Sequence, residues 1–246
     1  MIKKVILITA LLTFNLTSHA EGPPLVVAVD NFAPPFVLRA NQQFYGFDIA
    51  TMEELCRLVK RTCRYQPMAF SKLLEAVANN QAEAAIGAIT ITAQRAQLVN
   101  FTLPYMLSHA RFITSAAAAT QPFSYSMMDN KKIGVEEGSA FPLAIKTMGI
   151  INPQIVEYKN EETIIEELYN GNIDFALLDG PTALYWQSQS SDKLAVIGEQ
   201  FTYGYGFGIA VNKGNTTLLA ELNQAIQQYE KSEMYRSNYD KYLSSF

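Results

Sequence analysis

Histidine and cysteine are scarce in this sequence of 246 residues, which contains two of each. His19 lies in an N-terminal segment that we expect to be removed, so the mature chain keeps His109 alone. A histidine metal cluster or a histidine-activated nucleophile therefore has no sequence support, and we predict no metal, no cofactor and no catalytic residues. We expect His109 to be a polar loop residue. A pair of carboxylates could still act as acid and base, but sequence alone does not bring two together.

Basic residues are outnumbered by acidic ones, 19 against 23, which gives a formal charge of −4. Removing the first 20 residues takes away Lys3 and Lys4 and no acidic residue, so the mature charge becomes −6. Such a chain is not expected to bind nucleic acid. The negative charge suits solubility, and it also favours a cationic small ligand through long-range attraction.

The N-terminal apolar run is too short to span a membrane. It follows two lysines, extends over residues 5–16 and ends before Ser18-His19-Ala20, which has small residues at the two positions that define a cleavage site. A membrane-spanning helix needs about 18 or more uninterrupted apolar residues. This arrangement predicts a secretory signal peptide over residues 1–20, cleaved after Ala20, and export to a bacterial periplasm.

The two cysteines, Cys56 and Cys63, are seven positions apart in a chain that we expect to be exported. An even number of cysteines in an oxidising compartment favours a disulfide, although two separate thiols remain the alternative. One continuous helix would separate their Cα atoms by about 10 Å, whereas a disulfide allows roughly 7 Å at most. If the two are joined, a helix must therefore end between them.

Strand-like and helix-like segments alternate along the mature chain. In the first part we predict strands at 25–29, 64–67 and 84–89, a helix with an apolar stripe at 49–59, and a helix capped by Ser71. In the second part we predict strands at 132–135, 155–158 and 175–178, and helices after Gly138, at 161–169 and at 182–188. An apolar strand to Val211 and two helices end the chain. This pattern predicts two α/β units with parallel strands, and residues 115–121 are interpreted as a loop or a linker between them.

The alternating glycines of Gly204–Gly208 do not form a dinucleotide-binding motif, because an apolar strand follows them where that motif requires a helix. A β-bulge or a crossing strand fits better. Glycines alternating with aromatic residues could let a strand bend between domains, which is our hypothesis of a hinge.

The segment 84–95 joins a buried-type strand to an isolated arginine, Arg95. Thr92 is expected to cap a helix, so that backbone amides open beside the guanidinium, whose planar fork matches a carboxylate. This corner would suit the α-carboxylate of an amino acid. The alternative is a capped helix that carries one surface arginine.

Other parts of a recognition site are also present. Asp179 ends the predicted strand FALLD, where open α/β sheets bind ligands. Phe32, Phe36 and Phe70 could form the walls of a pocket. In the alternative interpretation Asp179 begins a turn or caps a helix, and the phenylalanines belong to the core.

These residues resemble a known family, the extracellular amino-acid-binding proteins of ABC importers, and most closely its arginine-binding branch. The matching segments are YGFD at 45–48, AFSKL at 69–73, GAITITAQR at 87–95, FTLPY at 101–105, IGV at 133–135 leading to Gly138-Ser139, GNID at 171–174, Asp179 and GIAV at 208–211. The spacing of the two cysteines is also similar to that of the arginine-binding branch.

The resemblance implies a two-lobed α/β fold of the type II periplasmic-binding-protein kind. Each lobe would be a sheet flanked by helices, and two crossover segments would form a hinge. Residues 21–109 and 205–246 would make lobe 1, and residues 110–204 would make lobe 2. A ligand would be enclosed when the lobes close.

The resemblance also implies roles for individual residues. Arg95 would hold the ligand carboxylate, helped by the backbone amides of Thr90 and Ala140. The Thr90 hydroxyl, Asp179 and the Ala88 carbonyl would take the ammonium group. The remaining residues of the predicted site are Phe70 against the ligand side chain, Asp30 as an acidic position for cationic ligands, and Phe32, Phe36, Gly87 and Ser139.

Some positions depart from the family pattern. Ala33 stands where relatives usually have Tyr, Ala88 replaces a common Ser or Gly, and Ala140 and Phe141 replace a Thr with a polar neighbour. Phe32 could supply the missing stacking ring. The amide donors persist with any of these side chains.

The sequence therefore predicts a periplasmic binding protein without chemistry of its own. It would capture a polar, cationic L-amino acid, with arginine favoured over lysine, ornithine or histidine, and deliver it to an inner-membrane ABC permease as a monomer. Two alternatives remain, an enzyme of the same fold that resembles cyclohexadienyl or arogenate dehydratases, and a sensory or partner-binding protein.

Overall fold

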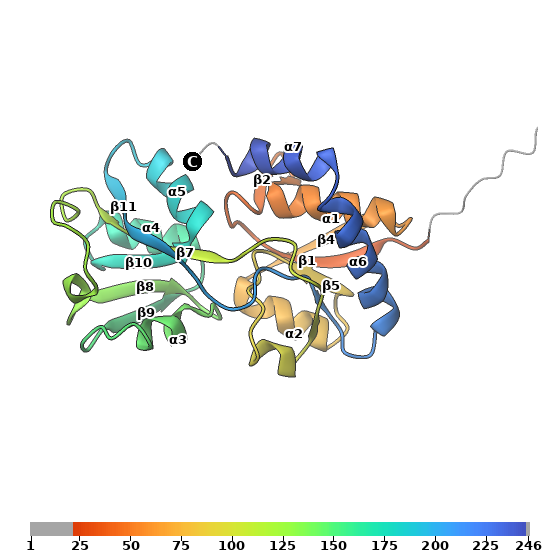
Figure 1. Ribbon diagram of the computed structural model, residues 1–246, viewed down its shortest axis with the longest axis horizontal. Helices are drawn as coiled ribbons and strands as arrows, with labels where there is room; N and C mark the ends of the chain where they lie inside the picture. Colours follow the sequence, from red (N-terminus) through yellow and green to blue (C-terminus); the bar gives the residue numbers. More distant parts are fainter. Residues whose placement is uncertain (1–21, 245–246) are drawn as a thin grey trace, which may run out of the picture.

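The computed structural model describes residues 22–244, so the predicted signal peptide and its cleavage site lie outside the described residues. Within this range the chain forms two lobes side by side, each built on a five-stranded sheet with helices against it (Figure 1). No helix between residues 22 and 244 is long and apolar enough to cross a membrane.

The first lobe is built on a sheet with the strand order β4-β1-β5-β12-β6. Its strands are β1 (Leu25–Asp30), β4 (Cys63–Met68), β5 (Ala84–Ile86), β6 (Asn100–Phe101) and β12 (Ala210–Val211). Helices α1 (Phe47–Leu58), α6 (Thr216–Tyr229) and α7 (Glu233–Tyr242) cover one face, and α2 (Leu73–Ala78) covers the other. Strand β1 runs parallel to β4 and β5. Because helices cover both faces of this sheet, side chains on either side of β1 and β5 are buried, and both strands are almost entirely apolar.

The second lobe is built on a sheet with the strand order β11-β7-β10-β8-β9. Its strands are β7 (His109–Ser115), β8 (Lys132–Glu136), β9 (Gln154–Tyr158), β10 (Phe175–Asp179) and β11 (Leu194–Thr202). Helix α3 (Phe141–Lys146) covers one face, and α4 (Glu161–Tyr169) and α5 (Gly180–Gln189) cover the other. The parallel strands β8 and β10 end at the edge that faces the first lobe, and this places Glu136 and Asp179 there.

Two segments join the lobes, one between β6 and β7 and one between β11 and β12 (Figure 1). They contact each other, since the Tyr105 N–H donates to the carbonyl oxygen of Phe207 at 2.9 Å. Gly204 has a φ of +61°, and a Cβ there would lie 2.4 Å from Cγ2 of Thr90 and 2.7 Å from the carbonyl oxygen of Ile91. The segment 203–208 therefore crosses between the lobes and needs Gly204, but it forms isolated β-bridges and not the predicted strand, while the hinge motion and the lobe boundaries stay predictions.

The disulfide between Cys56 and Cys63 is confirmed, with its Cα atoms 5.9 Å apart. Helix α1 ends at Leu58 and β4 begins at Cys63, so the helix ends between the two cysteines as the geometry requires. The bridge fastens the end of α1 to the start of the neighbouring strand.

Several local predictions were wrong. Ser71 does not cap α2, because it lies inside a 3₁₀ turn (Phe70–Lys72) and Lys72 occupies the cap position. His109 is not a loop residue but begins β7. Residues 116–121 form a loop within the second lobe and not a linker, since β7 already belongs to that sheet. The hairpin β2 (Leu38–Ala40) and β3 (Gln43–Tyr45), and the 3₁₀ turns Arg95–Gln97 and Tyr125–Met128, were not predicted.

Candidate functional site

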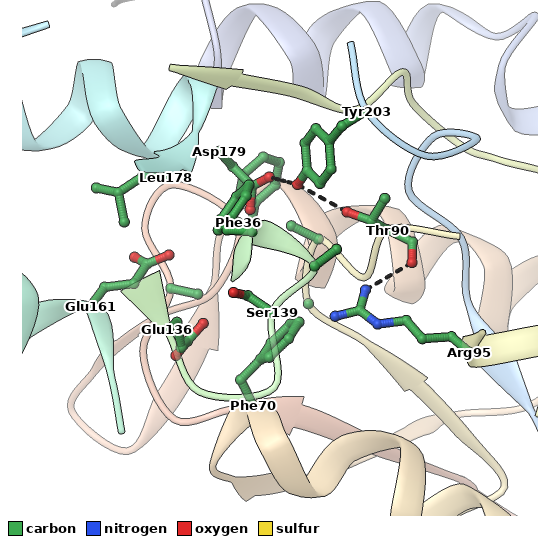
Figure 2. A pocket seen from close by; sticks show the side chains of 15 residues that line it. Phe36, Phe70, Thr90, Arg95, Glu136, Ser139, Glu161, Leu178, Asp179 and Tyr203 are labelled. Carbon is green, nitrogen blue, oxygen red and sulfur yellow. Dashed lines mark hydrogen bonds between the residues drawn. The ribbon is translucent and has the colours of Figure 1, made fainter. Parts of the chain in front are cut away.

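A pocket lies between the lobes, and both lobes line it (Figure 2). Its residues from the first lobe are Ala33, Phe36, Phe70, Gly87, Ala88, Thr90 and Arg95. From the second lobe come Glu136, Ser139, Ala140, Phe141, Glu161, Leu178 and Asp179, and Tyr203 comes from the crossing segment. A molecule held here would contact both lobes at once.

Arg95 lies at one end of this pocket (Figure 2). Its guanidinium donates to the carbonyl oxygen of Thr90 at 2.8 Å and to that of Gly138, in the second lobe, also at 2.8 Å. It also stands 5.4 Å from the centre of the Phe70 ring. Burial lowers the pKa of Arg95, and the nearby groups of Tyr203, Asp179 and Glu136 act against this shift. The guanidinium is thus a half-buried cation that faces the second lobe.

Asp179 approaches the pocket from the opposite lobe. It accepts a hydrogen bond from the Tyr203 hydroxyl, which in turn accepts one from the Thr90 hydroxyl at 2.9 Å. Burial raises the pKa of Asp179 to about 7, although Tyr203 and the positive charge of Arg95 lower it. This chain of hydrogen bonds connects an acid of the second lobe to a hydroxyl of the first.

The turn after β5 has an unusual backbone. Gly87 has a φ of +156°, and Ala88 has a φ of +47°, a left-handed conformation that costs a non-glycine residue free energy. Asp48, which is completely buried in α1, holds this turn because its Oδ2 accepts the Ala88 N–H at 2.6 Å. Its Oδ1 accepts the Tyr105 hydroxyl at 2.9 Å. Asp48 thereby fixes the first-lobe wall of the pocket.

Three further carboxyl groups gather near the pocket, on Asp30, Glu136 and Glu161. They are 2%, 6% and 5% exposed. Burial raises the pKa of Asp30 to about 7. Burial also raises the pKa values of both glutamates well above their usual range, assisted in each case by the charges of Asp30 and Asp179, while a hydrogen bond from Trp186 lowers the pKa of Glu161. In the described part of the chain, no group of three or more His, Cys, Asp or Glu residues could hold a metal ion.

Comparison with known proteins assigns the chain to a family. Residues 25–245 match the bacterial extracellular solute-binding proteins, family 3. The putative ABC transporter arginine-binding protein 2 of Escherichia coli (strain K12) is 31% identical over 248 residues, which cover 98% of this chain and 99% of that protein. The chain belongs to this family of solute-binding proteins.

Solved structures agree with the fold of this solute-binding protein. An ancestral arginine-binding protein, solved with arginine and with glutamine, superposes with TM-scores of 0.83 and 0.82. It is 26% identical, and the match covers 91% of this chain and 99% of that one. The two-lobed α/β type II fold predicted from the sequence is confirmed.

Most of the predicted site residues of the solute-binding protein line one pocket. These are Phe36, Phe70, Gly87, Ala88, Thr90, Arg95, Ser139, Ala140 and Asp179. Asp30 lies just behind the pocket, next to Gly87. Phe32 is not among the residues that line this pocket, and its ring packs edge-to-face against Trp186 of the second lobe, with centroids 6.3 Å apart. The binding roles of all these residues stay predictions.

The expected helix at Thr92 is only a 3₁₀ turn. Thr92 still accepts the Arg95 N–H at 3.2 Å, so the predicted cap exists, but it leaves a single turn beside the guanidinium. The alternative of a surface arginine is wrong, because the Arg95 guanidinium lies in the pocket. For Asp179 and Phe36 both interpretations hold. Asp179 precedes α5 and lines the pocket, and Phe36 is buried in the core and lines the pocket.

Sequence reasoning missed Glu136, Glu161 and Tyr203 as parts of the site. Glu136 ends a parallel strand just as Asp179 does, and Glu161 begins a helix after one, so the rule that identified Asp179 also applies to them. Tyr203 directly precedes the segment Gly204–Gly208, for which the sequence predicts only a hinge. Its position between Asp179 and Thr90 depends on the crossing of the chain, for which the sequence has no local signal.

Proposed function

We propose that this solute-binding protein captures a cationic L-amino acid, with arginine favoured, in the periplasm and delivers it to an ABC permease. The observation that carries the proposal is the placement of Arg95 and Asp179, two opposite charges on opposite lobes, at one buried pocket. The Arg95 fork suits an α-carboxylate, and Asp179 suits an α-ammonium group.

The physical reason is desolvation. An amino acid that enters the pocket loses the hydration of two charges, and each must be replaced by an opposite charge or by several hydrogen bonds. Arg95 and Asp179 can contact the same ligand only when the two lobes are closed on it. The ligand therefore binds the closed form better than the open form, which is the condition for a ligand to drive closure.

The direct contacts between the lobes support closure as the bound arrangement. Arg95 donates to Gly138, and Phe32 packs on Trp186. A Cβ on Gly138, which has a φ of +80°, would lie 2.9 Å from Cα of Ser71. Glycine at position 138 thus permits a close backbone approach of the two lobes beside the pocket.

Arginine is favoured for two reasons. The relatives described above are named arginine-binding proteins, and the pocket of this chain has more acidic groups than Arg95 alone can balance. Delivery to a permease and a periplasmic location rest on the family and on the predicted signal peptide. We propose that the protein carries out no chemistry on its ligand and acts as a monomer.

The test is calorimetric titration of the variants Arg95→Ala and Asp179→Ala with arginine, lysine, histidine, ornithine, glutamine and glutamate. Breaking a buried charged contact costs about 2 kcal/mol or more, which corresponds to a roughly 30-fold loss of affinity. We expect that loss in each variant for the amino acid that the wild-type protein binds.

A matched control is Arg57→Ala, which removes an exposed arginine of α1 that pairs with Glu54, far from the pocket residues. It should leave affinity unchanged. Near-normal binding by both pocket variants would reject the proposed site. Turnover of a cyclic acid by the wild-type protein would instead favour an enzyme.

A further inference from the structure

Two buried glutamates, Glu136 and Glu161, line the pocket, and a third buried carboxyl group, that of Asp30, lies just behind it. Oδ2 of Asp30 and Oε1 of Glu136 have no hydrogen-bond partner among residues 22–244, and the Glu161 carboxyl group has only the Trp186 side chain as a neighbouring donor. All three residues are more than nine-tenths buried. Both glutamates line the pocket, and Figure 2 shows them at the end opposite Arg95. Unpaired carboxylate oxygens are costly inside a protein, so each needs an explanation.

The protein itself does not supply a neutralising cation for this end of the pocket. Arg95 acts on Glu136 from a distance, but its guanidinium bonds to the carbonyl oxygens of Thr90 and Gly138. The described ion pairs of the chain involve other acidic residues. Glu136 and Glu161 also feel the charges of Asp30 and Asp179, which disfavour their ionisation. A bound cation would relieve this repulsion.

We propose that Asp30, Glu136 and Glu161 form the subsite for the side chain of the ligand, and that this subsite is built for a guanidinium group. The inference rests on the function proposed above and extends it to side-chain recognition. The α-carboxylate and α-ammonium groups would bind at Arg95 and Asp179, and the side chain would extend toward the glutamates.

A guanidinium fits the three carboxyl groups better than other cations do. It presents five N–H donors in a plane, so it can reach several acceptors that surround it, whereas an ammonium group is a compact point charge with three donors. The acceptors here come from two lobes, with Asp30 at the end of β1 and the glutamates on β8 and α4. A metal ion is not supported, because these carboxyl groups do not converge as metal ligands within the described residues.

The same arrangement couples side-chain recognition to closure. Asp30 belongs to the first lobe, and Glu136 and Glu161 belong to the second. A guanidinium that contacts all three therefore binds the closed form better than either lobe alone. A neutral side chain of the same shape would leave the carboxyl oxygens unpaired.

The test compares arginine with citrulline, whose neutral ureido group has nearly the shape of the guanidinium. Calorimetric titration gives the ratio of the two dissociation constants for the wild-type protein, Glu136→Gln, Glu161→Gln and Asp30→Asn. We expect the wild-type protein to bind arginine at least tenfold more tightly than citrulline. Each substitution should shrink this ratio at least fivefold, chiefly by weakening arginine binding.

The matched control is Glu137→Gln. It removes the exposed acid that directly follows Glu136 and does not line the pocket. The control ratio should equal the wild-type ratio, because the preference for arginine comes from the three named carboxyl groups and not from the overall negative charge of the protein. Glutamine has almost the shape of glutamate and removes a buried charge, so we expect the test variants to melt at or above the wild-type temperature.

A second measurement counts protons. The carboxyl groups that face one another here are Asp30 on β1, Glu136 on β8, Glu161 on α4 and Asp179 on β10, with Arg95 as the nearby cation. Burial raises the pKa values of all four, and acidic neighbours, including the exposed Glu162 beside Glu161, add to this for the two glutamates, so a guanidinium should expel protons when it binds. Titration near pH 7 in two buffers of different ionisation enthalpy should show more protons released with arginine than with citrulline.

The outcomes separate the two proposals. If arginine binds but its preference over citrulline is absent, or persists unchanged in the glutamine variants, the side-chain subsite is overturned and the proposed function stands. If a glutamine variant does not fold, equal proton release by arginine and citrulline in the wild-type protein overturns the subsite. If the wild-type protein binds none of the tested amino acids, both proposals fail.

Discussion

Asp48 does not line the pocket, but its hydrogen bonds hold the backbone of a pocket residue, Ala88, in place. Its two carboxylate oxygens accept the Ala88 N–H and the Tyr105 hydroxyl, and its side chain is completely buried. Burial raises its pKa to about 7, while both hydrogen bonds lower it. The left-handed conformation of Ala88 persists because Asp48 holds that amide.

At this scale we predict that Asp48→Ala lowers both stability and affinity. The substitution leaves a buried amide and a buried hydroxyl unpaired, and each costs about 1–3 kcal/mol. Urea unfolding should show a clearly larger loss for Asp48→Ala than for Tyr105→Phe, which removes only one of the two bonds. Equal losses would mean that the bond to the Ala88 amide contributes nothing.

Single residues also show what the sequence can and cannot predict. Arg95 and Asp179 were predicted because each stands next to a recognisable strand end and within a family motif. Glu136 and Glu161 were missed although they stand at element ends comparable to that of Asp179, because no family motif singled them out. Phe32 was predicted as a wall, yet it contacts Trp186, a residue more than 150 positions away, and no local pattern predicts that contact.

Among the structural elements, the crossing segment between β11 and β12 joins the two lobes and also contributes to the wall of the pocket. Gly204 lies against Thr90 and Ile91, and Tyr203 joins Thr90 to Asp179. The buried apolar strands β1, β8 and β10 were predictable from their composition. Strands β7 and β11 were not, because their antiparallel pairing joins segments that are distant in sequence.

We predict that Gly204→Ala lowers the affinity for arginine, because it displaces the crossing segment from Thr90. Alanine at a positive φ costs about 1 kcal/mol or more anywhere, and at position 204 its Cβ would also press on Thr90 at 2.4 Å. Gly171→Ala is the matched control, because Gly171 has a similar φ of +70° and nothing lies within 4 Å of its Cβ position. Both variants should lose stability in chemical denaturation, but only Gly204→Ala should lose arginine affinity. Equal affinities of the two would contradict this account.

For the whole molecule, the buried acids make stability depend on pH. The folded pKa values of Asp30, Asp48 and Asp179 are about 7, above the ordinary value of 3.8 that we take for the unfolded chain. Between about pH 4 and pH 7 the folded state therefore binds more protons than the unfolded state, so the free energy of unfolding falls as pH rises. Below pH 4 both states are protonated and the contribution is fully present.

The predicted result is that the ligand-free protein unfolds at a higher urea concentration at pH 5 than at pH 8. Arginine should stabilise it more at pH 8, because ionised carboxylates bind the cation better. Urea titrations at both pH values, with and without arginine, measure this. Higher ligand-free stability at pH 8 would contradict the raised pKa values of these three acids in the folded protein.

The two lobes act as one binding unit because the charges that meet the ligand are divided between them. Arg95 and Asp30 belong to one sheet and its loops, and Asp179, Glu136 and Glu161 belong to the other lobe. The overall α/β architecture was predictable from the alternation of strands and helices. The closed arrangement was not, because it depends on contacts such as that between Arg95 and Gly138.

The most direct measurement is a calorimetric titration of the mature wild-type protein with arginine, after unfolding and refolding to remove any bound ligand. The account predicts saturable binding of one arginine per protein molecule. Absence of binding to arginine and to every other cationic amino acid tested would contradict it.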